Sequence, residues 1–276
     1  MNKHSNDPIV AFEEETRERI ACYGDDRAWQ SLSTQWLQRA FEQRYMYNFR
    51  CLGRPIIQTP IDMVALQEII WQVRPDLVIE TGIAHGGSLV LSAAMLSLLD
   101  YCDALEAGRP LDPRQTRRRV LGIDIDIRRH NRAAIESHPM SHRIDMVEGS
   151  SIAEETIRKV RAAAQGHERV LVCLDSNHTH AHVLAELEAY APLTTPGSYC
   201  CVFDTIIEDL GADTFPDRPW HPGDNPKTAV REYLRQLETP GRRAADGQPL
   251  QLVIDSQLEA KLMLSVAPGG YLRRPD

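Results

Sequence analysis

The sequence predicts an α/β fold in which a mainly parallel sheet is covered by helices on both faces. Three observations support this prediction. Apolar, strand-like runs alternate with helix-like segments between residues 77 and 236. The first run, 77–80, passes directly into a glycine-rich turn and a helix. The following runs end in acidic residues, and the carboxyl ends of parallel strands meet at one edge of a sheet, where ligands bind.

Each element follows from its apolar pattern and from the residues that interrupt it. The expected strands are 77–80, 119–124, 144–147, 169–175 and 198–204. The expected helices are 61–73, 87–99, 128–137, 152–164, 179–190 and 226–236. Two later strands, 251–254 and 260–266, have a short connection and are expected to pair antiparallel at the edge, which makes seven strands. The Arg-rich stretch 103–119 is expected to be a surface insertion with a solvated face.

Residues 1–60 are rich in aromatic side chains and predict a helical extension that serves as a lid, ahead of a main domain over 61–276. Gly53, Pro55 and Pro60 interrupt the helical pattern before the main domain begins. Tyr47 of this extension is a candidate for contact with the substrate.

Composition limits the possible classes of function. The chain has 276 residues and a net charge of −8, which argues against nucleic-acid binding. Residues 1–8 lack the apolar core of a signal peptide, and no apolar stretch approaches the length of a membrane span. None of the six cysteines forms a C-x-x-C pair, so we expect buried, reduced thiols in a cytoplasmic protein.

The turn after the first strand predicts a cofactor loop. Glu80 ends the strand, and Gly82, Gly86 and Gly87 follow it, so that the backbone can approach a ligand closely. A dinucleotide fingerprint would require glycine at position 84, where the sequence has Ala84. An acidic residue before the first glycine suits a cationic ligand, which favours S-adenosylmethionine. Another ligand-binding turn and a purely structural turn are the alternatives.

Acidic and small residues at the ends of the next two strands extend this site. Asp124 is expected to accept hydrogen bonds from ribose hydroxyls, and Asp126 to cap the following helix. The alternative is that both acids only cap. Gly149 and Ser150 are expected to border the adenine, and a helix N-cap is the compatible alternative for Ser150.

The fourth and fifth strands deliver Asp175 and Asp204 to the same edge, where two carboxylates form a natural site for Mg²⁺. His178, three residues after Asp175, is a candidate general base, with a turn histidine as the structural alternative. The run of alternate histidines at 178, 180 and 182 does not predict zinc, because alternate residues of a helix do not share a face.

A long loop, 205–228, follows the fifth strand and contains four prolines. Its aromatic residues favour a substrate lid, with a plain structural loop as the alternative. Trp220 and His221 are therefore candidate substrate-binding residues.

Taken together, these motifs make the sequence similar to the cephalosporin hydroxylase/rhamnosyl O-methyltransferase (CmcI) family, over about residues 45–272. The segments that carry the resemblance are 79–88, 122–126, 148–151, 174–178, 202–204 and 225–228. The resemblance implies a Rossmann-like class I methyltransferase fold and an O-methyltransferase that uses S-adenosylmethionine and Mg²⁺. It also implies a small-molecule acceptor, for which a sugar or a glycosylated natural product is the expected class. We expect neither a nucleic-acid nor a membrane partner, and we expect a homo-oligomer.

The resemblance also implies roles for single residues. Glu80, Gly82, Ala84, Gly86 and Ser88 would hold the methionine part of the cofactor. Asp124, Gly149, Ser150 and Asp175 would complete the cofactor site. Asp175, Asp204 and Asn177 would bind the metal, and His178 would be the base beside Asp175. In such relatives the fifth strand often ends in Glu-Asp, whereas here it ends in Phe203-Asp204, so one metal carboxylate is missing. The vacancy would fall to Asn177, Glu208 or water.

Three rival functions remain. An NAD-dependent oxidoreductase would require the fingerprint that Ala84 breaks. A non-catalytic, cofactor-binding member that assists a partner enzyme would not require the intact set of acids and histidine. An iron hydroxylase would require a facial set of two histidines and one carboxylate, such as His178, His180 and Asp175.

Overall fold

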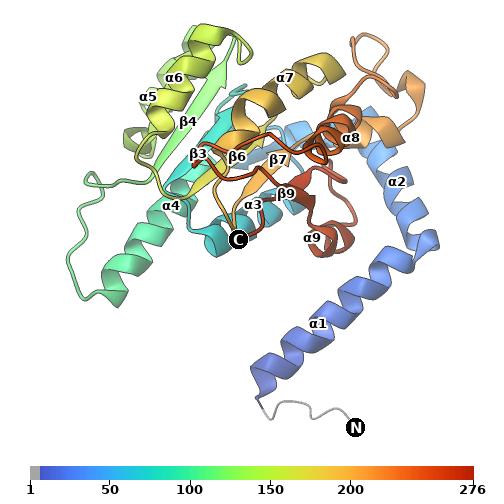
Figure 1. Cartoon of the computed structure of the whole chain (residues 1–276), viewed down its shortest axis with the longest axis horizontal. Coiled ribbons are helices and arrows are strands. Elements are labelled where there is room, and N and C mark those ends of the chain that lie inside the picture. The colour runs from blue at the N-terminus through green and yellow to red at the C-terminus, as the bar shows by residue number, and fades with distance from the viewer. Residues whose placement is uncertain (1–6) are drawn as a thin grey trace.

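A seven-stranded sheet forms the centre of the molecule and confirms the α/β fold expected from the sequence (Figure 1). The computed structural model describes residues 7–276 of the chain. The spatial order of the strands is β5-β4-β3-β6-β7-β9-β8; those from β5 to β7 run parallel, and β9 is antiparallel to both of its neighbours. The strands are β3 (Leu77–Thr81), β4 (Arg119–Asp124), β5 (Ile144–Glu148), β6 (Val170–Leu174), β7 (Tyr199–Val202), β8 (Val253–Ile254) and β9 (Tyr271–Arg273).

Helices cover both faces of this sheet, and their side chains form two separate apolar cores. One core contains residues of α2, α3, α4 and α5, and the other contains residues of α6, α7 and α8. The helices are α1 (Pro8–Asp25), α2 (Arg27–Glu42), α3 (Pro60–Val73), α4 (Gly87–Glu106), α5 (Arg129–Glu136), α6 (Glu154–Ala164), α7 (His180–Tyr190), α8 (Pro226–Leu237) and α9 (Ser256–Lys261). Short 3₁₀ helices are η1 (Tyr45–Asn48), η2 (Ser141–Arg143), η3 (Ala191–Leu193), η4 (Thr205–Asp209) and η5 (Ala212–Thr214).

The parallel strands are buried on both faces, which explains their continuous apolar sequences. Val78 and Leu171 belong to one core, whereas their neighbours Ile79 and Val172 belong to the other. The chain reverses its direction of travel across the sheet between β3 and β6, because β4 lies on one side of β3 and β6 on the other. Ligands of open α/β sheets bind at such a point, outside the carboxyl ends of the strands.

The antiparallel edge was assigned in part to the wrong residues. The segment 260–266, expected to be a strand, contains the end of α9 and the turn after it, and the antiparallel partner of β7 is β9. The Asp255 side chain accepts a hydrogen bond from the Leu258 backbone N–H and starts α9. Leu258, Leu262 and Val266, four residues apart, pack inward on the first core. The apolar residues of this segment fit a helical spacing as well as a strand pattern, and the Asp255 cap favours the helix.

The segment before the main sheet is helical only in part. A β-hairpin, β1 (Phe49–Cys51) with β2 (Arg54–Ile56), lies within the range 1–60 that was expected to be helical. Its two-residue turn, Leu52-Gly53, has positive φ at both positions, as short hairpin turns require. In Figure 1 the first part of α1 extends away from the body of the molecule, whereas its last turns, with Ile20 and Gly24, lie beside α9. None of the residues of α1 is buried. A boundary between two domains at residue 60 stays a prediction.

The Arg-rich insertion is shorter than expected, because α4 continues to Glu106. Its Arg118 does not lie on a solvated face: this side chain bridges Asp100 and Asp103 of α4. Contrary to expectation, α4 is long and apolar enough to cross a membrane by length and composition. In this fold α4 packs against α3 and the sheet, so its apolar side chains contribute to the core.

The expectation of buried thiols is correct for four of the six cysteines. Cys51, Cys173, Cys200 and Cys201 are buried, whereas Cys22 is exposed and Cys102 is partly exposed; all six are free thiols. The expectation that residues 1–8 are no signal peptide concerns a segment of which residues 1–6 lie outside the described part of the chain.

Candidate functional site

The glycine turn packs directly on the end of the neighbouring strand. Gly82 has φ +91°, and a Cβ atom there would lie 2.1 Å from the backbone carbonyl oxygen of Asp175. Ala84, at the position where a dinucleotide fingerprint has glycine, has φ +45° and so adopts the left-handed conformation that glycine favours. The turn therefore keeps the backbone shape of a ligand-binding loop despite the alanine.

The N-terminal hairpin covers this turn, which the sequence had not indicated. A Cβ atom on Gly87 would lie 2.3 Å from the carbonyl oxygen of Pro55, so the start of α4 and β2 are in close contact. Arg54 Nε donates a hydrogen bond of 3.0 Å to the carbonyl oxygen of His85. The hairpin is thus part of the site, and the pair of adjacent glycines at 86 and 87 was the available signal.

Asp124 holds the turn in place. One carboxylate oxygen accepts hydrogen bonds from the backbone N–H groups of Ile83 (2.9 Å) and Ala84 (3.2 Å), and the other accepts from Asp126 (3.1 Å). Its expected bond to ribose would therefore be made by an already oriented carboxylate. The prediction that Asp126 caps the next helix is wrong, because α5 has Arg128 at its N-cap and no side-chain cap. Asp126 is exposed instead.

Gly149 lies beside Asp124 at the same edge of the sheet. Its N–H donates to the Asp124 carbonyl oxygen over 2.8 Å, and Ser150 follows it in the turn before α6. The alternative in which Ser150 caps the helix is wrong, since α6 begins after Ala153, which has no side-chain cap hydrogen bond. The expected contact of Gly149 and Ser150 with an adenine stays a prediction.

Glu80 is a buried carboxylate at the base of the turn, with 3% of its surface exposed. Ser88, in the first turn of α4, donates a hydrogen bond to it. Burial raises the pKa of Glu80 to about 7, against the lowering effect of the Ser88 hydroxyl. A cation in contact with Glu80 would restore the charged form.

The structure brings Asp175, His178 and Asp204 together. One potential ligand atom from each lies within 4.8 Å of the other two, and His178 Nδ1 is 3.3 Å from Asp204 Oδ2. Burial raises the pKa of Asp175, and repulsion from Asp204, Glu80 and Glu186 raises it further. Burial also raises the pKa of Asp204, which His178 opposes. An arrangement of close carboxylates that resists ionisation in this way favours a bound cation.

Asp204 is held in an uncommon backbone conformation, with φ +56° at the end of β7. Left-handed conformations of residues other than glycine are concentrated at functional sites, although Asp tolerates them better than most residues. This conformation turns the chain away from the sheet into η4 directly after the carboxylate.

The candidates for the missing metal carboxylate are engaged elsewhere. The Asn177 side-chain oxygen accepts hydrogen bonds from the backbone N–H (3.0 Å) and hydroxyl (2.8 Å) of Thr179. Glu208 accepts from the Gly223 backbone N–H and the Asn225 side chain. Phe203, where such relatives often have Glu, packs edge-to-face on Tyr271 with 6.2 Å between the rings. Both side chains thus have protein partners here, and a role for Asn177 or Glu208 in holding a metal stays a prediction.

The other two histidines of the run have structural contacts. His180 lies 2.8 Å from the Thr228 hydroxyl and 3.2 Å from Glu232, and so joins α7 to α8. His182 Nε2 faces Ser151, Ser176 and Glu186. The three histidines do not converge, as their alternate spacing led us to expect. Because His180 is turned to α8, the facial set of an iron hydroxylase is not formed either.

Of the three expected substrate residues, Trp220 is at the site. Its ring packs edge-to-face on the His178 ring at 4.7 Å, and Arg218 lies over it at 5.2 Å. His221 is exposed and its Nδ1 is 2.8 Å from the Pro222 carbonyl oxygen. Tyr47 is 57% exposed. Contact of His221 and Tyr47 with a substrate stays a prediction.

The loop that carries Trp220 is anchored at both ends, as a lid that closes one side of a site requires. Phe215 packs on Phe41 of α2 at 5.4 Å, and Gln38 donates to the Thr214 hydroxyl over 2.9 Å. At the other end, Glu208 binds Gly223 and Asn225. The N-terminal helix α2 therefore supports the loop over the carboxyl edge.

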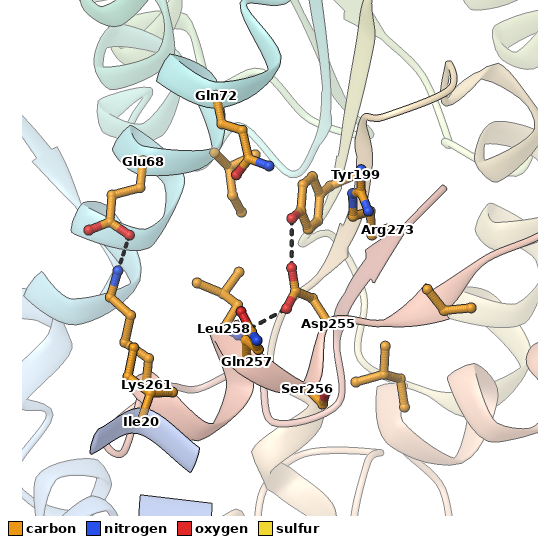
Figure 2. Close-up of a pocket in the computed structure, with 13 residues that line it drawn as sticks. Ile20, Glu68, Gln72, Tyr199, Asp255, Ser256, Gln257, Leu258, Lys261 and Arg273 are labelled. Atoms are coloured by element: carbon orange, nitrogen blue, oxygen red, sulfur yellow. Dashed lines mark hydrogen bonds and ion pairs between the residues drawn. The ribbon is translucent and has the colours of Figure 1, made fainter. Parts of the chain in front are cut away.

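A separate cavity of about 560 Å³ lies between α3, α9 and the strands β7, β8 and β9 (Figure 2). Tyr199, at its wall, is the first residue of β7, so the cavity opens at the edge of the sheet opposite Asp204. Figure 2 shows the Tyr199 hydroxyl donating to Asp255, over 2.7 Å, and the Glu68–Lys261 ion pair across the opening. This cavity is distinct from the cluster of acids and histidine.

Comparisons with known proteins agree with this geometry. The family described as rhamnosyl O-methyltransferase/CmcI matches residues 43–275. The rhamnosyl O-methyltransferase of Mycobacterium leprae (strain TN) is 30% identical over 226 residues, which cover 81% of this chain and 82% of that protein. The enzyme of the same name from Mycobacterium tuberculosis (strain ATCC 25618 / H37Rv) is 29% identical over 77% of this chain and 73% of its own length.

Two solved structures share the fold. The structure described as "CmcI-N160 apo-structure" has a TM-score of 0.53 at 17% identity, and covers 83% of this chain and 77% of that one. The one described as "cmcI-D160 Mg-SAM" has a TM-score of 0.51 at 17% identity, with coverages of 83% and 78%. At this identity, the similarity is one of fold.

Proposed function

This chain belongs to the rhamnosyl O-methyltransferase/CmcI family and is therefore an S-adenosylmethionine-dependent O-methyltransferase, and we propose that it methylates a sugar hydroxyl of a small molecule with the help of a divalent cation. The observation that carries the proposal is the meeting of Asp175, His178 and Asp204 beside the glycine turn. It combines a place for a cationic cofactor with a place for a second cation and a base.

The residues present fit S-adenosylmethionine. Gly82 and Gly86 let the turn pack closely on the rest of the site, since a Cβ atom on either would lie within 2.5 Å of Asp175 or Ile135. Glu80 supplies a buried carboxylate for a positively charged group, and Ser88 orients it. Asp124, already held by the turn, supplies an acceptor for ribose hydroxyls.

The donor set also fits magnesium. Asp175 and Asp204 offer carboxylate oxygens, which Mg²⁺ prefers, and the remaining positions would be left to water or substrate oxygens. A relative of the same fold is described as a complex with Mg and SAM. The cofactor supplies an electrophilic methyl group, and a divalent cation lowers the pKa of a hydroxyl that it coordinates.

His178 is the base that this arrangement offers. Its Nδ1 faces Asp204 at 3.3 Å, so a proton on Nδ1 is held by the carboxylate and Nε2 is left to accept one from a substrate hydroxyl. Trp220 packs on the His178 ring and limits its rotation. Holding the hydroxyl and the base in fixed positions supplies much of the rate enhancement in such a reaction.

A sugar acceptor is supported by the relatives and by Trp220. The relatives of about 30% identity are named rhamnosyl O-methyltransferases. An aromatic ring beside the base gives an apolar surface on which the face of a sugar ring can pack.

Methyl transfer from S-adenosylmethionine to a rhamnosyl glycoside, with and without magnesium, tests the proposal. We expect transfer that magnesium stimulates, and we expect Asp204→Ala to lose that stimulation and to reduce turnover about a hundredfold or more, because the carboxylate contacts both the cation site and His178. Asp217→Ala, an exposed acid of the same loop, is the matched control and should behave as wild type. Full activity of the wild type in a chelator would rule out the metal.

A further inference from the structure

Gln58, in the segment between β2 and α3, forms a hydrogen bond with only one of the two polar atoms of its side-chain amide. Its side chain is 8% exposed, and Nε2 donates a hydrogen bond of 3.2 Å to Asp175 Oδ2. Oε1 is buried and has no hydrogen-bond partner within residues 7–276. An ionised carboxylate only accepts, so with Asp175 ionised, as a bound cation would keep it, the amide nitrogen faces Asp175 and the oxygen is left without a protein donor. An unpaired buried acceptor costs free energy unless a ligand satisfies it.

Gln58 lines a small cavity whose volume suits one water-sized group. The cavity measures about 10 Å³ and is lined by Gln58, Glu80 and Asp175, with apolar walls that include Leu91 and Phe203. A volume of this order accommodates about one water molecule, and an ammonium group has a similar size. Five polar side chains with oxygen atoms line it: Gln58, Asp62, Glu80, Ser88 and Asp175. An ammonium group has three N–H donors and no acceptor, so it suits a lining of this kind.

Gln58 is held in place by a hydrogen-bond network with α3 and the C-terminal strand. The next residue, Thr59, caps α3 and donates to Asp62 over 2.6 Å. Asp62 is buried and also accepts from the Val266 backbone N–H (3.0 Å) and the Tyr271 hydroxyl (2.8 Å). This network fixes the chain directly after Gln58, and a residue on a fixed segment of chain has less freedom to lose when a ligand arrives.

We propose that Gln58 is a positioning residue which accepts a hydrogen bond from the α-ammonium group of the cofactor through Oε1 and orients Asp175 through Nε2. This inference rests on the proposed function, because it requires a cofactor with an amino-acid end. It links the two halves of the site: the residue that recognises the methionine end also holds a carboxylate of the cation cluster. Gln58 touches no transferred methyl group or acceptor hydroxyl in this arrangement, so its effect on the reaction runs through the cofactor and Asp175.

The test compares two ligands that differ only in the group in question. Calorimetry measures binding of S-adenosylhomocysteine and of its analogue with hydrogen in place of the α-amino group, to wild type, Gln58→Met and Gln58→Glu. We expect wild type to prefer the amine, and Gln58→Met to reduce that preference about tenfold or more, because a hydrogen bond to a charged group is lost. Gln72→Met, on an exposed turn of α3, is the matched control and should leave the preference unchanged.

The second variant separates the two bonds. Gln58→Glu keeps an oxygen in the cavity but loses the donor to Asp175, so the amine preference should persist while kcat falls about tenfold with little change in KM for the cofactor. A Gln58→Met protein that binds both ligands more weakly but keeps the wild-type preference would show a merely structural role. Wild-type kcat in Gln58→Glu would remove the link to Asp175. If wild type binds neither ligand, the proposed function itself fails, and that outcome is distinct from both.

Discussion

Glu80 is a carboxylate that the fold excludes from water at a place where we propose a cation. Its pKa is raised to about 7, with burial as the main cause. The pKa of Asp175 is raised as well, mainly by burial and in part by repulsion from Asp204 and Glu80. Ionising these buried carboxylates therefore costs free energy in the ligand-free protein, and bound positive charge offsets that cost. Asp204, at φ +56°, adds a strained backbone to the same place.

At the residue scale, we predict opposite pH dependences for stability and for cofactor binding. The pKa of Glu80 in the folded state lies above its unfolded value of 4.5. The contribution of Glu80 to the free energy of unfolding is therefore fully present below pH 4.5 and falls by about 3 kcal/mol as the pH rises to about 7. Binding of S-adenosylhomocysteine should tighten over the same range, because its ammonium group favours ionised Glu80. Thermal unfolding and calorimetry between pH 5 and pH 8 check both trends, and Glu80→Gln should flatten them. A ligand-free protein that becomes more stable toward pH 8, relative to Glu80→Gln, would contradict the assignment.

Elements of this fold are joined by buried polar contacts as well as by apolar packing. Arg143, the last residue of η2, is fully buried and donates to Asp100 of α4 over 2.6 Å and to Thr116 of the insertion over 2.7 Å. Arg118 binds the same carboxylate. One acid of α4 thus holds the insertion and the start of β5 together, far from the catalytic edge. The hairpin plays the comparable part at that edge, where Pro55 contacts Gly87.

At the element scale, we predict that Asp100→Asn destabilises the protein by about 3 kcal/mol, because it leaves the buried Arg143 charge unpaired. Burial by itself would raise the pKa of Asp100, but hydrogen bonds from Thr116, Arg143 and Arg118 outweigh it and hold the pKa below its usual range. The stabilisation by ionised Asp100 is thus fully present above the pKa of the unfolded state, and it is lost as the pH falls through the lower pKa of the folded state. Urea unfolding at pH 7 and pH 3.5 measures the difference, which should shrink in acid. Glu106→Gln, exposed at the end of α4, is the control and should change neither value.

The whole molecule consists of a sheet with two apolar cores and an N-terminal segment of two helices, α1 and α2, which differ in how much they bury. None of the residues of α1 is buried, whereas α2 buries Leu37 and Ala40 in the first core and supports the loop of Trp220 through Phe41 and Gln38. The two helices therefore contribute differently, although both belong to the segment expected to be a lid. Self-association of the chain stays a prediction that light scattering can check.

At the scale of the molecule, we predict that removal of residues 1–25 changes the melting temperature by only about 2 °C and leaves binding of S-adenosylhomocysteine intact, because no core contact is lost. Removal of residues 1–42 should lower the melting temperature several times more and weaken acceptor binding, since Leu37 and the supports of the loop are removed. Differential scanning calorimetry of the two truncated proteins provides the comparison. Equal losses in both would mean that α1, and not α2, supports the loop.

Much of the fold and of the site could be predicted from local sequence. The parallel strands have apolar runs of the right length, and each run ends in a residue that can bind a ligand or begin a turn. Sequential strands of a parallel sheet share one edge, so Glu80, Asp175 and Asp204 could be placed together without coordinates. The wrong predictions near residues 126, 150 and 260 concern short segments where a cap or a turn decides between patterns that one sequence permits. The hairpin within 1–60 and the ion pairs of Arg118 were not predicted either.

Sequence alone thus determined the sheet, the glycine turn and the set of acids with His178, because their physical causes lie within a few neighbouring residues. Only the tertiary structure decided that the hairpin covers Gly87, that Gln58 reaches Asp175 and that His180 is turned to α8. Gln58 and Asp175 are 117 residues apart in the chain, and no local pattern records a hydrogen bond over that separation. Such contacts depend on how the hairpin, α3 and the strand ends pack, which is a property of the assembled fold.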